Sequence, residues 1–161
     1  MTYSDFKVGD IILFRSRSFL GWLIRLFTGS RFNHVALVSS LNGELIINEA
    51  DTDGIVYQVF PDYLDAKYIK IGRPRKEFDR NKFVERANFE IGKPYDYLNL
   101  LGEQVIKSIT GVWRGDGKTD KFICSSYVAY VYELQSWEKY SPSDFDKQIE
   151  IFDFKFEGKI K

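Results

Sequence analysis

The chain has 161 residues, a length that fits one domain with a substantial hydrophobic core and is short for two. Its 23 Lys and Arg residues balance 23 Asp and Glu residues, so it lacks the net positive charge that holds nucleic acids through counterion release. Aromatic residues make up 17% of the chain, which favours a core with β-strands and rigid apolar walls around a ligand. We therefore expect one domain over residues 1–161, without a nucleic-acid partner and without an obligate protein partner.

The N-terminal sequence lacks the basic start, apolar run and small-residue cleavage site of a signal peptide. We therefore expect a cytoplasmic protein, in which the one cysteine, Cys124, stays a free thiol. The longest apolar stretch lies between Phe19 and Phe27 and is shorter than the roughly 20 residues of a membrane-spanning helix. We expect this stretch to form a buried helix. The alternative is peripheral contact with a membrane or with a lipid-like substrate, because arginines flank the stretch.

The first half of the chain has patterns typical of β-strands. Predicted strands cover residues 11–14, 33–41, 44–50, 55–60 and 68–71. Asn42-Gly43 separates the second run from the third, and this dipeptide is the strongest short hairpin signal. Near the C-terminus, Phe152, Phe154 and Phe156 alternate with polar residues, which predicts a further strand with one solvent-exposed face.

The second half of the chain has helical patterns. Asp79 is expected to cap a helix over residues 82–89, and a second helix is expected over residues 95–109. Apolar residues at positions 124, 127, 128, 131 and 134 follow helical spacing, so Cys124 lies near the start of a third helix. Together the predicted elements indicate an α+β fold, with an antiparallel sheet or small barrel packed against helices.

The only histidine, His34, opens the second predicted strand. If Asn42-Gly43 is a two-residue turn, the numbers of paired residues add up to 85, and Glu49 becomes the diagonal neighbour of His34 on the same face. A carboxylate on one ring nitrogen fixes the orientation of an imidazole and leaves the other nitrogen to accept a proton. A register shift of one residue would select Asp51 or Asn48 instead, and Asn48 is the second choice.

A thiol in the first turn of a helix is favoured as the thiolate, because unpaired N–H groups and the positive end of the helix dipole are close to it. The thiolate of Cys124 is thus the candidate nucleophile, and nearby backbone N–H groups can stabilise an oxyanion. Ser125 and Ser126 are weaker candidates, because hydroxyls are less acidic and these two point in other directions around the helix. The alternative is that Cys124 is an inert buried cysteine and that His34 only begins a strand.

Five short segments resemble the NlpC-type papain-like cysteine hydrolases, in the order of that family: residues 8–14, 33–38, 47–50, 91–97 and 122–128. The histidine precedes the cysteine here, as in the circularly permuted branch with the YiiX-like proteins and the relatives of lecithin-retinol acyltransferase. The resemblance implies a papain-like fold in permuted order and a catalytic triad of Cys124, His34 and Glu49.

The resemblance also implies a reaction, which is hydrolysis of an amide bond in a peptide or cell-wall-type peptide through a thioester acyl-enzyme. No metal or other cofactor is expected. A lipid acyl hydrolase or acyltransferase with the same triad is one alternative, and a non-catalytic binding module is another. Tyr95 and Tyr97 lie in a segment that leads toward the cysteine helix in this family and are candidates for substrate binding. Trp113, in a glycine-rich loop before that helix, is a third candidate.

Overall fold

The computed structural model describes residues 5–15, 25, 30–60, 68–96, 102, 104–112 and 121–159. Its strands are β1 (Ile11–Phe14), β2 (His34–Ser40), β3 (Ile46–Asp51), β4 (Gly54–Val59), β5 (Ile69–Pro74) and β6 (Phe152–Gly158). These strands form an open antiparallel sheet in the order β4-β3-β2-β1-β5-β6. The predicted α+β class and the antiparallel sheet are confirmed, whereas β4 and β6 remain the two edges instead of closing a barrel.

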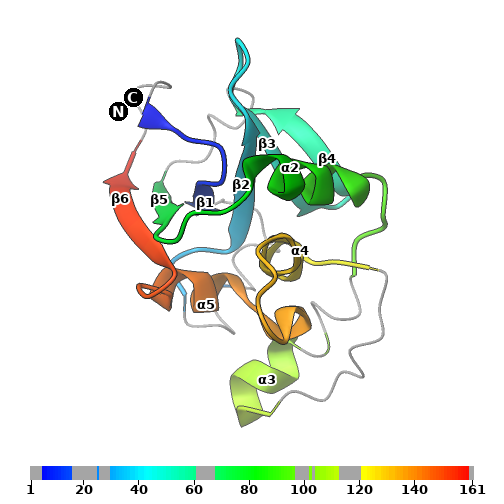
Figure 1. Cartoon of the computed structure of the whole chain (residues 1–161). Helices are drawn as coiled ribbons and strands as arrows, with labels where there is room; N and C mark the ends of the chain where they lie inside the picture. Colours follow the sequence, from blue (N-terminus) through cyan, green and yellow to red (C-terminus); the bar gives the residue numbers. More distant parts are fainter. Residues whose placement is uncertain are drawn as a thin grey trace.

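The helical elements are α2 (Arg80–Phe89), α3 (Gln104–Thr110), α4 (Cys124–Val131), the 3₁₀-helix η4 (Trp137–Lys139) and α5 (Pro142–Lys147). Helix α4 lies at the centre of the molecule, beside β2 and β3, and it also contacts α2 (Figure 1). Asp79 caps α2 as predicted, because its side chain accepts hydrogen bonds from the backbone N–H groups of Asn81 and Lys82. No helix in the described part of the chain is long and apolar enough to cross a bilayer.

The sheet is buried on both faces, which explains why its central strands are almost continuously apolar. One face packs against α4 and includes Ile11 and Leu13 of β1 with Val35 and Leu37 of β2. The other face forms a second cluster from the alternate positions of the same strands together with β3 and β5, and its members include Ile12, Phe14, Ala36, Val38, Ile47, Ile69 and Ile71. Within β1 and within β2, successive residues therefore belong to opposite faces, as the strand period of two requires.

The hairpin between β2 and β3 has the predicted register but a different turn. Leu37 pairs with Asn48 and Val38 with Ile47, so the residue numbers add up to 85. The connection is a longer loop over residues 41–45, and Ser40 pairs with Ile46 after an irregularity in β2. The irregularity is a bulge that adds one residue to β2 and compensates for the longer loop. The pairs on the far side of the bulge from the loop, Val38 with Ile47 and Leu37 with Asn48, therefore keep the register of a two-residue turn.

Three further expectations need correction. Phe152 and Phe154 pack against the α4 side, but Phe156 packs in the opposite cluster, because a register shift opposite Ile71 and Gly72 reverses the alternation. The helix predicted from residue 95 does not begin there, since residue 95 forms a β-bridge with residue 122 and α3 begins at residue 104. Helix α4 ends at residue 131 and not at 134, and residue 133 has a positive φ of 55°. The stretch 19–27 lies outside the described residues, apart from residue 25.

Candidate functional site

His34 and Glu49 meet across two neighbouring strands, β2 and β3. His34 is the first residue of β2 and its side chain is 18% exposed, whereas the side chain of Glu49 in β3 is fully buried. The Nε2 atom of His34 and the Oε2 atom of Glu49 form a hydrogen-bonded ion pair. The contact expected from the strand register is therefore present. A buried carboxylate in this position holds one nitrogen of the imidazole and fixes the plane of the ring.

Phe14 packs against the His34 ring. It lies opposite His34 in the β1–β2 pairing, and the two ring centroids are 5.7 Å apart with an angle of 44° between the planes. This aromatic wall limits the rotation of the imidazole, which adds to the constraint from Glu49. Phe14 was not among the site residues expected from the sequence. The pairing of β1 with β2 would have revealed it, but the long connection between these strands leaves their register undetermined by turn geometry.

Cys124 is the first residue of α4, and the preceding residue, Ile123, has an extended backbone with φ −96° and ψ 166°. The cysteine is 2% exposed and is a free thiol. The Ser126 hydroxyl accepts a hydrogen bond from the backbone N–H of Ile123 and donates one to its carbonyl oxygen. These bonds stabilise the first turn of α4 and so fix the place of Cys124.

The two serines that follow Cys124 have other partners. Ser125 is buried and its hydroxyl donates to the backbone oxygen of Tyr140, over 2.7 Å. Ser126 is occupied by the first turn of the helix, as described above. Both hydroxyls thus connect parts of the fold, which agrees with their lower rank as nucleophiles.

The pKa of His34 depends on both Cys124 and Glu49. Burial by itself lowers the pKa of His34, but the charges of Cys124 and Glu49 and hydrogen bonds to both side chains together raise the pKa well above its ordinary value of 6.5. Since Nε2 faces Glu49, Nδ1 is the ring nitrogen left for the thiol. The imidazolium form of His34 is therefore favoured between the Glu49 carboxylate and the Cys124 side chain.

Asn48 and Asp51, the two alternatives to Glu49 as partner of His34, form hydrogen bonds with other residues. Asn48 points to the α4 side of the sheet, where its Nδ2 donates to Oδ1 of Asn88 over 3.0 Å and reaches Tyr127. Asp51 is bound to Gln58 and to the backbone N–H of Asp53. It lies within electrostatic range of His34, and its pKa is raised chiefly by burial. The predicted register holds, and it gives the contact with His34 to Glu49 and not to Asn48.

Of the three candidates for substrate binding, Tyr95 is the one that lies within the described residues. Tyr95 is half-buried against the α4 side of the core and forms a parallel β-bridge with Phe122, two residues before Cys124. The backbone N–H of Asp96 donates to the Phe122 oxygen over 2.9 Å. The segment around Tyr95 therefore lies beside the residues that lead into α4. Tyr97 and Trp113 lie outside the described residues.

Comparisons with known proteins identify a fold but not a sequence family. No protein-family model matches the chain, and no curated protein matches it. Five chains of solved structures do match. One of them is the crystal structure of the metalloprotein YiiX from Escherichia coli O157:H7, with a TM-score of 0.61 and 23% sequence identity. The match covers 79% of this chain and 64% of the YiiX chain, so this chain spans less than two thirds of that protein's length. At this identity the match shows a YiiX-like α+β fold.

Proposed function

We propose that the protein is a cysteine hydrolase of the circularly permuted papain-like kind, which cleaves an amide bond through Cys124, His34 and Glu49. The observation that carries the proposal is that His34 interacts with both Glu49 and Cys124, although the three residues come from β2, β3 and α4. The order of histidine before cysteine and the fold shared with YiiX support the permuted assignment. Structural ion pairs also shift pKa values, but a lone cysteine at a helix start beside an oriented imidazole fits a nucleophile and its base.

In the first half of the proposed reaction, the Cys124 sulfur attacks the carbonyl carbon of the substrate as the thiolate, with its proton on His34. The carbonyl oxygen becomes an oxyanion, and backbone N–H groups at the start of α4 lie near this position and favour negative charge. The C–N bond then breaks, and the leaving amine takes the proton from the imidazolium. A thioester between Cys124 and the acyl group of the substrate remains.

In the second half, neutral His34 accepts a proton from a water molecule, whose oxygen attacks the thioester carbonyl. The C–S bond breaks, the carboxylic acid leaves, and the sulfur regains the starting thiolate–imidazolium pair with the proton on His34. Glu49 acts on this cycle through His34, because its carboxylate stabilises the imidazolium and keeps the ring in one orientation. Glu49 is therefore a positioning residue in this mechanism.

A metal ion has no role in the proposed reaction. YiiX is described as a metalloprotein, which raises the question of whether this chain carries a similar ligand set. The chain contains one histidine and one cysteine, and no group of three or more His, Cys, Asp or Glu side chains within the described ranges is arranged to hold a metal. The described residues thus do not fit a metal centre built from histidine and cysteine ligands.

Intact-protein mass spectrometry tests the proposal directly, because Cys124 is the only cysteine. Acid quenching during turnover of a γ-glutamyl or lysyl peptide should trap an acyl group on Cys124, and Cys124→Ala should lose turnover by more than about 1,000-fold while it stays folded. Ser125→Ala is the matched control, since it removes a neighbouring hydroxyl and should keep the activity. Full turnover in Cys124→Ala would refute the proposal.

The same experiment separates the alternative substrates. The three side chains have the same roles whether the acyl group comes from a peptide or from a lipid, so an acyl-lipid is tested beside the peptides. Release of free fatty acid without cleavage of any peptide would identify a lipid acyl hydrolase. Transfer of the trapped acyl group to an added amine or alcohol, faster than to water, would identify an acyltransferase.

Thiol alkylation distinguishes an enzyme from a binding module that has only kept the fold. Iodoacetamide reacts with the thiolate, and one cysteine gives one reaction to follow. At neutral pH the wild-type protein should react faster than His34→Ala, because the imidazolium stabilises the thiolate. A wild-type profile identical to that of His34→Ala would favour the binding module.

A further inference from the structure

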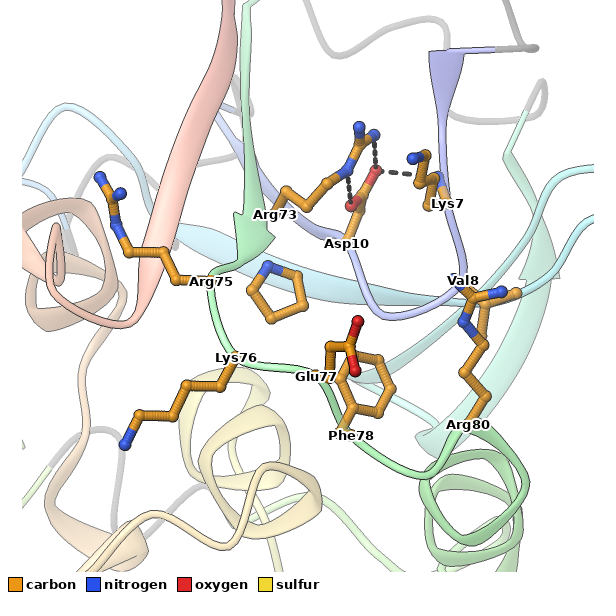
Figure 2. A pocket seen from close by; sticks show the side chains of 10 residues that line it. Lys7, Val8, Asp10, Arg73, Arg75, Lys76, Glu77, Phe78 and Arg80 are labelled. Atoms are coloured by element: carbon orange, nitrogen blue, oxygen red, sulfur yellow. Dashed lines mark hydrogen bonds and ion pairs between the residues drawn. The ribbon is translucent and has the colours of Figure 1, made fainter.

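A polar cavity lies between the segment before β1 and the connection from β5 to α2. It has a volume of about 280 Å³, close to the lower limit of about 300 Å³ for pockets that hold drug-sized ligands. Its lining consists of Lys7, Val8, Asp10, Arg73, Pro74, Arg75, Lys76, Glu77, Phe78 and Arg80 (Figure 2). Five of these ten residues are cationic and two are acidic. A net charge of +3 is therefore concentrated in one cavity of a chain whose total charge is zero.

The Asp10 carboxylate is bound to Arg73 and to the Lys7 backbone, so it does not neutralise the other cationic side chains of this cavity. It is completely buried and accepts hydrogen bonds from Nε and Nη2 of Arg73, each over 2.8 Å. It also accepts one from the backbone N–H of Lys7 over 2.9 Å. The bidentate pair holds Arg73 and Asp10 in place, and Figure 2 shows these bonds and the one from Lys7 as dashed lines. Glu77 is then the acidic side chain of the lining that is left to oppose the other cations.

The remaining cations surround the cavity from two sides. In Figure 2, Lys7 and Arg80 lie on one side, whereas Arg75 and Lys76 extend on the other, with Glu77 and Phe78 between them. Among the described residues, no salt bridge joins Lys7, Lys76 or Arg80 to an acidic side chain. These three exposed side chains are thus available to a ligand.

The cavity also has a rigid apolar wall. The Phe78 ring lies directly over Gly9, where an added Cβ would be 2.1 Å from Cζ of the ring. Only a glycine allows this approach. The same ring packs against Phe83 at 4.9 Å between centroids and near Tyr132 at 6.3 Å. Phe78 therefore keeps its place, and cations around a fixed aromatic wall can hold a ligand with an anionic group and an organic part.

This cavity is separate from the candidate active site. Tyr132, which donates a hydrogen bond to the Gly9 carbonyl oxygen and contacts Phe78, is the C-cap residue of α4. Cys124 begins the same helix, eight residues earlier. With a rise of 1.5 Å per residue, the two ends are about 12 Å apart along the helix axis. The cavity lies at the C-terminal end of α4 and the thiol at its N-terminal end.

From these observations we infer that the cavity binds the phosphate group of a small organic molecule or of a lipid headgroup. A phosphate carries up to two negative charges and three acceptor oxygens, which match several Lys and Arg donors around one point. A single carboxylate would leave most of these donors without a partner. Glu77 opposes the ligand and limits its affinity. The inference does not depend on the proposed hydrolase activity.

Titration calorimetry with inorganic pyrophosphate tests this site on the full chain. Binding should be saturable and should weaken at higher salt. The double substitution Lys7→Gln/Arg80→Gln should weaken it by about tenfold or more, since each lost contact is a charge-assisted hydrogen bond. Glu77→Gln should strengthen it several-fold. Lys82→Gln/Lys147→Gln is the matched control, which removes two exposed cations outside the cavity and should leave the affinity unchanged.

Vesicle sedimentation identifies the source of the phosphate. Binding to phosphatidylcholine vesicles only when they contain phosphatidic acid, with loss in Lys7→Gln/Arg80→Gln, would indicate a lipid headgroup. Binding of pyrophosphate without binding to either vesicle would indicate a soluble ligand. The inference is overturned if neither pyrophosphate nor phosphatidic acid binds, or if the control variant loses as much affinity as Lys7→Gln/Arg80→Gln. It is also overturned if pyrophosphate moves the NMR signal of His34 and leaves the amide signals of residues 7 and 76–80 unchanged.

Discussion

His34 and Glu49 are fifteen residues apart, and their side chains form an ion pair across the β2–β3 hairpin. This contact depends on two irregularities that offset each other. The loop over residues 41–45 is longer than a two-residue turn, and a bulge in β2 adds the residue that restores the register beyond it. A bulge or a longer loop alone would turn Glu49 to the other face of the sheet. The position of the carboxylate is therefore set by the details of the hairpin.

The NMR titration of His34 is the most direct test of this relationship, because the chain has no other histidine. The titration midpoint should lie above the ordinary pKa of 6.5, since the charges of Cys124 and Glu49 outweigh the effect of burial. Glu49→Gln and Cys124→Ala should each lower the midpoint. Glu44→Gln, which changes an exposed acid in the hairpin loop, is the control and should leave it unchanged. A midpoint below 6.5 in the wild type would contradict the arrangement.

The pH dependence of stability should follow from the same shift. Because the pKa of His34 is raised in the folded state, its ionisation contributes stability that is fully present below pH 6.5, the ordinary pKa. This contribution is lost as the pH rises through the raised pKa of the folded protein. The difference in free energy of unfolding between the wild type and His34→Gln, measured by urea denaturation, should therefore decrease with rising pH across this range. A difference that grows with pH would show that the sign is wrong.

Asp10→Ala should destabilise the fold strongly. The substitution leaves the Arg73 guanidinium without its buried partner, and removal of one member of a buried ion pair costs about 3–5 kcal/mol. The free energy of unfolding from chemical denaturation measures this loss. Asp153→Ala is the comparison, because it removes an acid from the exposed pair with Lys155 and should cause no measurable change. Equal effects of the two substitutions would contradict the role of Asp10.

Gly54→Ala should cost more stability than Gly43→Ala. Both glycines have positive φ, of 113° and 82°, so an alanine is strained at either position by about 1–2 kcal/mol. At Gly54 the added Cβ would also lie 2.3 Å from the backbone oxygen of Lys93, whereas nothing lies within 4 Å at Gly43. Thermal unfolding of the two variants measures the difference. Equal melting temperatures would show that the segment around Lys93 yields to the new methyl group.

The sequence by itself determined the strands, helix α2, the start of α4 and the pairing of His34 with Glu49. Local patterns decide these features: a period of two gives the strands and their faces, Asp79 marks the start of α2, and apolar spacing places Cys124 near a helix start. The register of the hairpin could also be predicted from the sequence, because β2 and β3 are consecutive strands of the chain. This register predicts Glu49 beside His34, and the two side chains form that contact.

Only the tertiary structure decided the features that join distant segments. The approach of Cys124 to His34, the packing of Phe14 on the imidazole and the cavity around Phe78 each bring together residues from different elements. The bulge that moves Phe156 to the opposite face likewise depends on the pairing of β6 with β5. Packing and long-range pairing select these arrangements from many that satisfy the same local preferences, so a period or a turn signal does not specify them.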